Sequence, residues 1–138
     1  VVADAATAAV AATFCTPAEL RAFNALGEGD RLARFFALWT LKESILKAAG
    51  TGFLTPPQDV EIGFSPPAAR WNGSESPWQA WHGAFGTGHH IAVCVAAMPV
   101  PPRLAVLDAG PMVRSAAEPV PLALALDSLA VVPAGGTN

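Results

Sequence analysis

The fold is decided by the stretch Phe35-Phe36-Ala37-Leu38-Trp39-Thr40-Leu41-Lys42-Glu43-Ser44-Ile45-Leu46-Lys47-Ala48-Ala49-Gly50. Its strong helix formers predict a long helix over residues 31–49, with Asp30 as the N-cap. Gly50 and Gly52 are expected to end this helix, because glycine readily adopts the backbone conformations of a C-cap and a turn.

Charged side chains interrupt the apolar pattern of this helix. At about 100° per residue, one apolar stripe contains Leu32, Phe35, Phe36, Trp39 and Leu46, and a second face contains Leu38, Leu41 and Ile45. Glu43 falls inside the first stripe and Lys47 at its edge, whereas Lys42 is expected at the solvated periphery. Glu43 and Lys47 are either a simple i,i+4 pair, which contributes a few tenths of a kcal/mol, or a carboxylate and a lysine that await a cation and a phosphate.

Two shorter helices are expected before the long one. Residues 5–14 are Ala-rich and compatible with a helix. The run Thr16-Pro17-Ala18-Glu19 is typical of a helix start, with Thr as N-cap, Pro at the first position and Glu at N3. This helix should extend to about Leu26 and be closed by Gly27 and Gly29.

The strands are expected after the long helix. Val60–Phe64 alternates with period two, residues 65–77 form a loop or hairpin connection, and a strand is expected over 78–84. Ile91–Met98 is a continuous apolar run, which indicates a central strand. The chain is therefore expected to be α+β, with an antiparallel sheet packed on the long central helix.

Composition restricts the class of protein. The 138 residues are 52% hydrophobic and 14% charged, which favours a packed core over disorder. No apolar run approaches the ~20 residues that a membrane-spanning helix needs. A net charge of −3 argues against a broad nucleic-acid surface. We expect a domain over residues 1–100 and a Pro/Ala-rich extension over 101–138, whose apolar stretches 104–107 and 122–132 form either an extra strand pair or a loosely attached tail.

The central stretch resembles a known family signature. Trp39, Lys42-Glu43, Lys47, Gly50 and Gly52 reproduce the pattern W-x-x-K-E-[AS]-x-x-K-x-x-G-x-G of the 4′-phosphopantetheinyl transferases. Phe14–Leu20 is similar to the F-[ST]-x-x-E helix start of that family, and residues 60–62 and 88–94 are similar to its later strands. The resemblance covers about residues 5–98.

Two details of the resemblance favour the surfactin type, in which two similar halves form a pseudo-dimer. Trp39 precedes the Thr-Leu-Lys-Glu run, and Gly88-His89-His90 lacks the preceding Ser-x-Ser of the small trimeric synthases. The resemblance implies that this chain is the C-terminal half. The family motif G-[VI]-D-x-E should lie upstream of Val1, and an N-terminal half, or an equivalent chain, would complete the site.

The resemblance also implies roles for individual residues. Glu43 matches the acidic ligand of Mg²⁺, and Lys47 matches the lysine that meets the phosphates of coenzyme A. Lys42 and Gly52 are further candidates for coenzyme A binding, although a solvated lysine and a turn glycine are the simpler interpretations. Glu19 matches a family acid that is linked to the metal or helps to deprotonate the substrate serine; the alternative is the capping box with Thr16.

The implied function is Mg²⁺-dependent transfer of the phosphopantetheine arm of coenzyme A to a serine of an acyl or peptidyl carrier protein. This reaction would serve polyketide, nonribosomal peptide or fatty acid biosynthesis in the cytoplasm, without nucleic-acid or membrane partners. The alternative hypothesis is a non-catalytic binding or dimerisation domain with the same fold.

Overall fold

Three helices form the first half of the chain. The structure, a computed structural model, describes residues 2–85, 88–100, 102–109, 114, 118, 120–121 and 127–129. The helices are α1 (Val2–Phe14), α2 (Pro17–Asn24) and α3 (Glu28–Ala49), followed by the short 3₁₀ turns Gly52–Leu54 and Pro57–Asp59. The three expected helices are present, but α2 ends at Asn24 with Ala25 as its C-cap, so the expectation that Gly27 and Gly29 close it is wrong.

The strands form small antiparallel sheets. One sheet has the order β1-β2-β3, with β1 (Val60–Phe64), β2 (Pro67–Trp71) and β3 (Ser74–Glu75). A second has the order β5-β4-β8, with β4 (Trp78–Phe85), β5 (His89–Ala96) and β8 (Asp127–Leu129). A third pairs β6 (Leu107–Asp108) with β7 (Val120–Pro121). The chain is thus α+β, as expected, and pairs β1–β2 and β4–β5 are antiparallel throughout.

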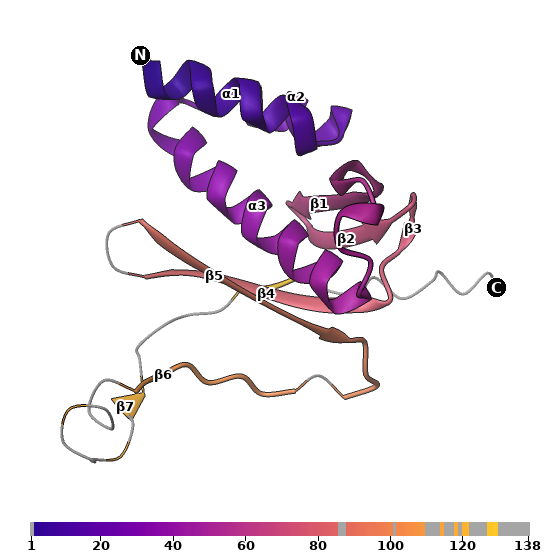
Figure 1. Cartoon of the computed structure of the whole chain (residues 1–138), viewed down its shortest axis with the longest axis vertical. Coiled ribbons are helices and arrows are strands. Elements are labelled where there is room, and N and C mark those ends of the chain that lie inside the picture. Colours follow the sequence, from indigo (N-terminus) through magenta and orange to yellow (C-terminus); the bar gives the residue numbers. More distant parts are fainter. Residues whose placement is uncertain are drawn as a thin grey trace.

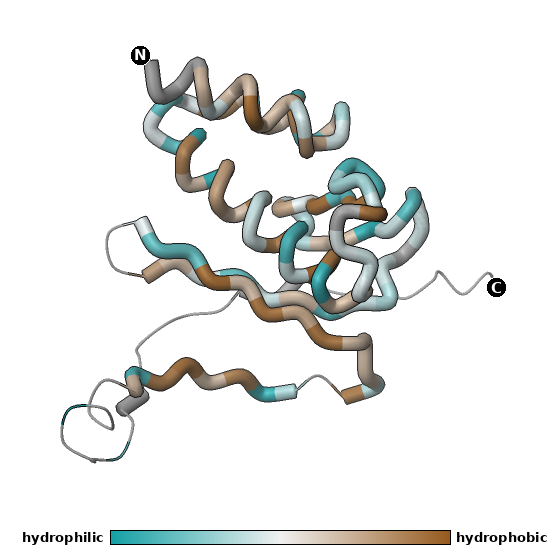
Figure 2. The backbone as a smooth tube through the Cα atoms, viewed as in Figure 1, coloured by the Kyte–Doolittle hydropathy of each residue, from teal (hydrophilic) through white to brown (hydrophobic). Residues whose placement is uncertain are grey.

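Helix α3 is the centre of the arrangement. In Figure 1, α1 and α2 lie along one side of α3, the β4–β5 hairpin crosses its other side, and β1 and β2 lie near its C-terminal half. Figure 2 shows apolar segments along β4 and β5 where they run beneath the helix. The buried core joins these elements and consists of Ala11, Phe14, Cys15, Phe23, Leu38, Leu41, Ile45, Leu46, Val60, Ile62, Ala69 and Ala80.

The ends of α3 differ in how well the sequence predicted them. The expected N-cap, Asp30, is wrong: the N-cap is Gly27, and Asp30 and Gly29 lie inside the first turn. Acidic side chains are favourable there because the N-terminus of a helix carries partial positive charge. The C-terminus is confirmed, because Gly50 is the C-cap in the left-handed conformation, with φ 69°.

The sheet also differs in one respect from the expectation. The central strand of the second sheet is β4, and β5 is at its edge, because β8 from the C-terminal segment pairs with β4 on the other side. Residues 65–77 form the hairpin that the sequence left open. Residues 122–126 and 130–132 of the second apolar stretch lie outside the described residues.

The division of the chain into a domain over residues 1–100 and an extension over residues 101–138 stays a prediction. Within the second of these segments, β8 (Asp127–Leu129) pairs with β4 of the second sheet. Among the residues that the structure describes, no helix combines the length and apolar character of a membrane span.

Candidate functional site

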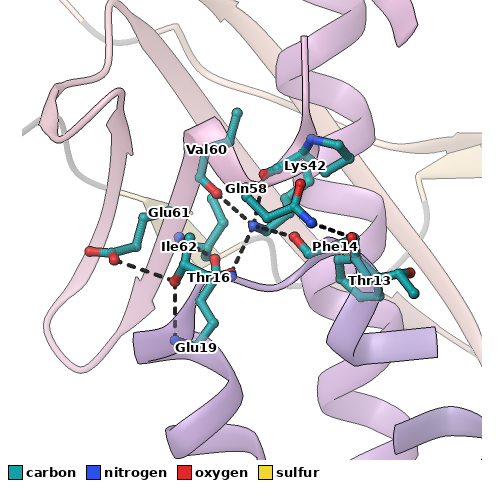
Figure 3. Close-up of polar contacts among 10 residues, drawn as sticks. Thr13, Phe14, Thr16, Glu19, Lys42, Gln58, Val60, Glu61 and Ile62 are labelled. Atoms are coloured by element: carbon teal, nitrogen blue, oxygen red, sulfur yellow. Dashed lines mark hydrogen bonds and ion pairs between the residues drawn. The ribbon is translucent and has the colours of Figure 1, made fainter. Parts of the chain in front are cut away.

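Lys42 lies in the interior, so the expectation that it is solvated is wrong. Its side chain is 2% exposed, and its ammonium lies 2.7 Å from the Oε2 atom of Glu19. The same ammonium donates to the backbone carbonyls of Phe14, Pro57 and Val60 at 3.1, 3.0 and 2.5 Å (Figure 3). An ammonium has three donors. Four protein oxygens therefore satisfy it without any ligand.

Glu19 is equally enclosed. Its backbone N–H donates to Oγ1 of Thr16 at 3.2 Å, and its carboxylate accepts from the backbone N–H of Thr16 at 2.7 Å, which completes the capping box. The other carboxylate oxygen accepts from the backbone N–H of Ile62 at 2.6 Å. The capping-box interpretation is confirmed, and Glu19 has the additional task of neutralising Lys42.

Together these groups form what we call the Lys42–Glu19 cluster: the two charged side chains, Thr16, and the backbone of Phe14, Pro57, Val60 and Ile62. The cluster ties the end of α1, the start of α2, the middle of α3 and the start of β1 together (Figure 3). Burial, and secondarily the carboxylate of Glu19, raises the pKa of the nearby Cys15 thiol to about 11. Cys15 is therefore a protonated, unreactive thiol at neutral pH.

The next residue along the helix has the opposite environment. The side chain of Glu43 is 35% exposed and that of Lys47 is 76% exposed, and Nζ of Lys47 lies 3.6 Å from Oε2 of Glu43. Glu43 is therefore not enclosed by the apolar residues of its stripe. The geometry is that of an accessible i,i+4 pair, open to a ligand from solvent.

The apolar stripe that contains Glu43 is divided: Leu46 is buried in the core and Phe35 packs against it, whereas the rest of the stripe lies on the outer side of α3. Leu32, Phe36 and Trp39 of this stripe are exposed, although an apolar stripe is usually the buried face of a helix. The core is instead built on the second face, with Leu38, Leu41 and Ile45 buried. The rings of Phe14 and Trp39 still meet edge to face, with centroids 5.2 Å apart. Glu43 therefore lies at one end of an exposed aromatic surface.

Glu43 fits a magnesium ion as one ligand of several. Among the described residues, no group of three His, Cys, Asp or Glu side chains comes together as a metal cluster. Mg²⁺ is commonly held by one or two carboxylates together with waters and substrate phosphates. The donor set of this chain fits such a shared site and does not fit a complete protein cage.

Two histidines, whose relation the sequence did not reveal, meet beside this surface. Nε2 of His82 and Nδ1 of His90 are 3.0 Å apart, and the ring of His90 also stacks on Phe36. Burial lowers the pKa of His90. The pairing of His82 with His90 depends on the register of β4 and β5, which sequence spacing does not specify. The aromatic side chain of Phe36 could have indicated that a ring packs against it.

Gly52 adopts a left-handed backbone conformation that favours glycine. Its φ is +52°, and an added Cβ would meet no atom within 4 Å. The turn interpretation is confirmed, and its surroundings are open. Lys42 and Glu19 are brought together inside the fold, Glu43 and Lys47 are brought together on its surface, and Gly52 follows the C-cap of the same helix.

Comparison with known proteins identifies one family. The family description "4'-phosphopantetheinyl transferase superfamily" matches residues 2–94, which include all three helices, β1 to β4 and most of β5. No curated protein and no solved structure gives a significant match. The chain belongs to the 4′-phosphopantetheinyl transferase superfamily.

Proposed function

We propose that this chain is the C-terminal half of a surfactin-type 4′-phosphopantetheinyl transferase. The enzyme would transfer the phosphopantetheine arm of coenzyme A to a serine of an acyl or peptidyl carrier protein, in the cytoplasm, for polyketide, nonribosomal peptide or fatty acid biosynthesis. The observation that carries the proposal is the accessible Glu43–Lys47 pair on α3, next to a motif lysine that the protein has enclosed.

Glu43 would hold Mg²⁺, which supplies neutralisation of the pyrophosphate charge when it is bound. Lys47 would approach the pyrophosphate of coenzyme A, because a flexible ammonium with 76% exposure can leave Glu43 at small cost. Gly52 would let the nucleotide come near the backbone after α3. We assign Lys42 and Glu19 to positioning these residues, since neither side chain reaches solvent.

In the transfer, the hydroxyl oxygen of the carrier serine forms a bond to the β-phosphorus of coenzyme A. The bond from that phosphorus to the bridging oxygen breaks, and 3′,5′-adenosine bisphosphate leaves. Lys47 would balance the charge that develops on the phosphate oxygens, as expected for a reaction that depends mainly on positioning and electrostatics. The serine proton would pass to a carboxylate of the second half of the site.

The second half of the site would come from an N-terminal half or an equivalent chain. The exposed Leu32, Phe36 and Trp39 lie on the same side of α3 as Glu43 and offer an apolar surface for it. Acidic residues of that half would add the ligands that Mg²⁺ requires beyond Glu43. The metal and coenzyme A would then lie between the halves.

The test is the mass of a carrier protein. This chain together with its N-terminal half, Mg²⁺ and coenzyme A should increase the mass of an apo carrier protein by one phosphopantetheine. Glu43→Gln should abolish the increase, whereas Glu28→Gln, which changes an exposed acid on the same helix, should leave it intact. Lys47→Met should raise the KM for coenzyme A by about tenfold or more, as expected for loss of a charged hydrogen bond. Full turnover in Glu43→Gln would remove Glu43 from the reaction.

The same exposed surface favours one alternative, a non-catalytic dimerisation domain of this superfamily. Calorimetry with coenzyme A distinguishes the two functions. Binding of coenzyme A to the two halves together supports the transferase, and absence of binding under those conditions supports the dimerisation domain.

A further inference from the structure

A cavity lies on the side of α3 away from Glu43. It has a volume of about 390 Å³, between α2, the N-terminal half of α3 and strand β1 with its end. This volume is in the range of pockets that hold small molecules. At 100° per residue, Arg34 is about 180° from Glu43 around α3, so a ligand here would not contact the proposed coenzyme A site. We call it the Arg34 cavity; its lining includes Phe23, Leu26, Arg34, Leu38, Glu61 and Phe64.

Arg34 is the charged group that gives this cavity its chemistry. Its guanidinium carbon lies 3.8 Å from the centroid of the Phe64 ring, so the flat group is held against an aromatic face. Burial lowers the pKa of Arg34, but an arginine stays charged in proteins. In the part of the chain that the structure describes, the guanidinium of Arg34 forms no ion pair within 4.0 Å and donates no hydrogen bond.

The acids that line the cavity are occupied elsewhere. Oε1 of Glu61 lies 3.1 Å from Nη1 of Arg70, and its Oε2 accepts from Thr16. Glu19 is neutralised by Lys42. Arg34 is therefore a cation with no ion pair within 4.0 Å among the described residues, and the charge of Asp30, four residues earlier on α3, acts on it from a greater distance. The other arginine at this end of α3, Arg31, differs because it donates to the carbonyls of Leu26 and Asn24.

The remaining walls are apolar. Phe23 and Leu38, which are buried core residues, line the cavity together with the half-buried Leu26. A guanidinium binds a carboxylate with two parallel hydrogen bonds. A doubly charged phosphate suits the cavity less well, because Arg34 is the one cation among its lining residues and most of the other walls are apolar.

We propose that the Arg34 cavity binds a small monocarboxylate with an apolar body. The carboxylate pairs with Arg34, and the apolar body contacts Phe23, Leu26 and Leu38. This site is separate from the Glu43–Lys47 pair and does not depend on metal or coenzyme A.

The experiment is an NMR titration of the chain with octanoate, 1-octanol and inorganic phosphate as probes. Octanoate should bind saturably with a Kd of roughly millimolar or tighter, as expected for a ligand of its size. 1-Octanol should bind at least about tenfold more weakly, because it lacks the charge. The amide shifts should concentrate in α2 and β1 and be absent around Glu43.

Two variants complete the test. Arg34→Met should weaken octanoate by about tenfold without changing 1-octanol, and Arg21→Met, which changes an exposed arginine of α2, should leave both unchanged. If Arg34→Met fails to fold, the test is whether octanoate shifts the amide signals of α2 and β1 in the natural chain and leaves those around Glu43 unchanged. Phosphate binding as tight as octanoate, octanoate binding that survives Arg34→Met, shifts outside the cavity, or no saturable binding would each overturn the proposal. All of these results are independent of transferase activity.

Discussion

Adjacent residues of one motif, Lys42 and Glu43, have opposite environments. Lys42 is 2% exposed and has four oxygen partners from the protein, whereas Glu43 is 35% exposed and has one, Lys47. The inner side of α3 thus builds the fold and the outer side is available for chemistry. The Lys42-Glu43 motif therefore combines a structural residue, Lys42, with an accessible residue, Glu43.

The largest expected effect is on the inner side. Lys42→Met should lower the free energy of unfolding by about 3–5 kcal/mol, because it leaves the buried carboxylate of Glu19 without its cation. Lys47→Met makes the same change five residues further along α3 and should cost less than about 0.5 kcal/mol. Urea unfolding of both variants measures the difference. Equal losses would contradict the division.

A double-variant cycle attributes the loss to the pair itself. Glu19→Gln combined with Lys42→Met should be less destabilised than the sum of the single variants, with a coupling of about 0.5–3 kcal/mol. Additive losses would mean that the two charges do not depend on each other.

Next in size is the cap of α2. Thr16→Ala should cost about 1 kcal/mol, because it removes the hydroxyl that accepts from Glu19 and donates to Glu61. Thr13→Ala is the matched control, since the exposed Thr13 hydroxyl donates to the carbonyl of Val10 in its own helix. Thermal unfolding should rank the two, and a larger loss in Thr13→Ala would contradict the role of the cap.

On the outer side, Glu43→Gln should change the free energy of unfolding by less than about 0.5 kcal/mol, because an exposed i,i+4 pair contributes little. Denaturant unfolding of the purified variant checks this value. A loss of several kcal/mol would place Glu43 with Lys42 among the structural residues and would weaken its use as a ligand.

The smallest effect concerns His90. Because burial lowers its pKa in the folded state, the unfolded chain binds more protons as the pH falls below about 6.5. The contribution of His90 to stability is therefore complete above that pH and is lost as the pH falls toward the folded pKa. Unfolding at pH 7.5 and 5.5 should show a smaller acid loss in His90→Gln than in the natural chain, and His89→Gln, at an exposed position, should behave like the natural chain. An equal acid loss in His90→Gln would contradict this.

Much of the fold was predictable because local signals determine it. The Thr16–Glu19 capping box, Gly50 and the period-two pattern of residues 60–64 each depend on neighbouring residues alone. The N-cap of α3 was missed because Asp30 is as favourable inside the first turn as before it. The place of β4 at the centre of its sheet depends on a strand about 45 residues later, which no local pattern indicates.

The candidate site was harder to predict, because the helix has two apolar faces and the sequence does not show which one the sheet covers. Lys42 lies four residues after Leu38 and three before Ile45, so this spacing did indicate the second face. What the sequence could not show is that Glu19 arrives from another helix to neutralise it. Long-range ion pairs of this kind depend on the packed arrangement of α2 and α3.

The division of α3 can be measured directly, because Lys42 and Lys47 are the two lysines of the chain. Labelling with an amine-reactive acetylating reagent, followed by peptide mass spectrometry, compares them in one sample. We predict rapid labelling of Lys47 in the native chain, protection of Lys42, and equal labelling of both in denaturant. Rapid labelling of Lys42 in the native chain would contradict the account.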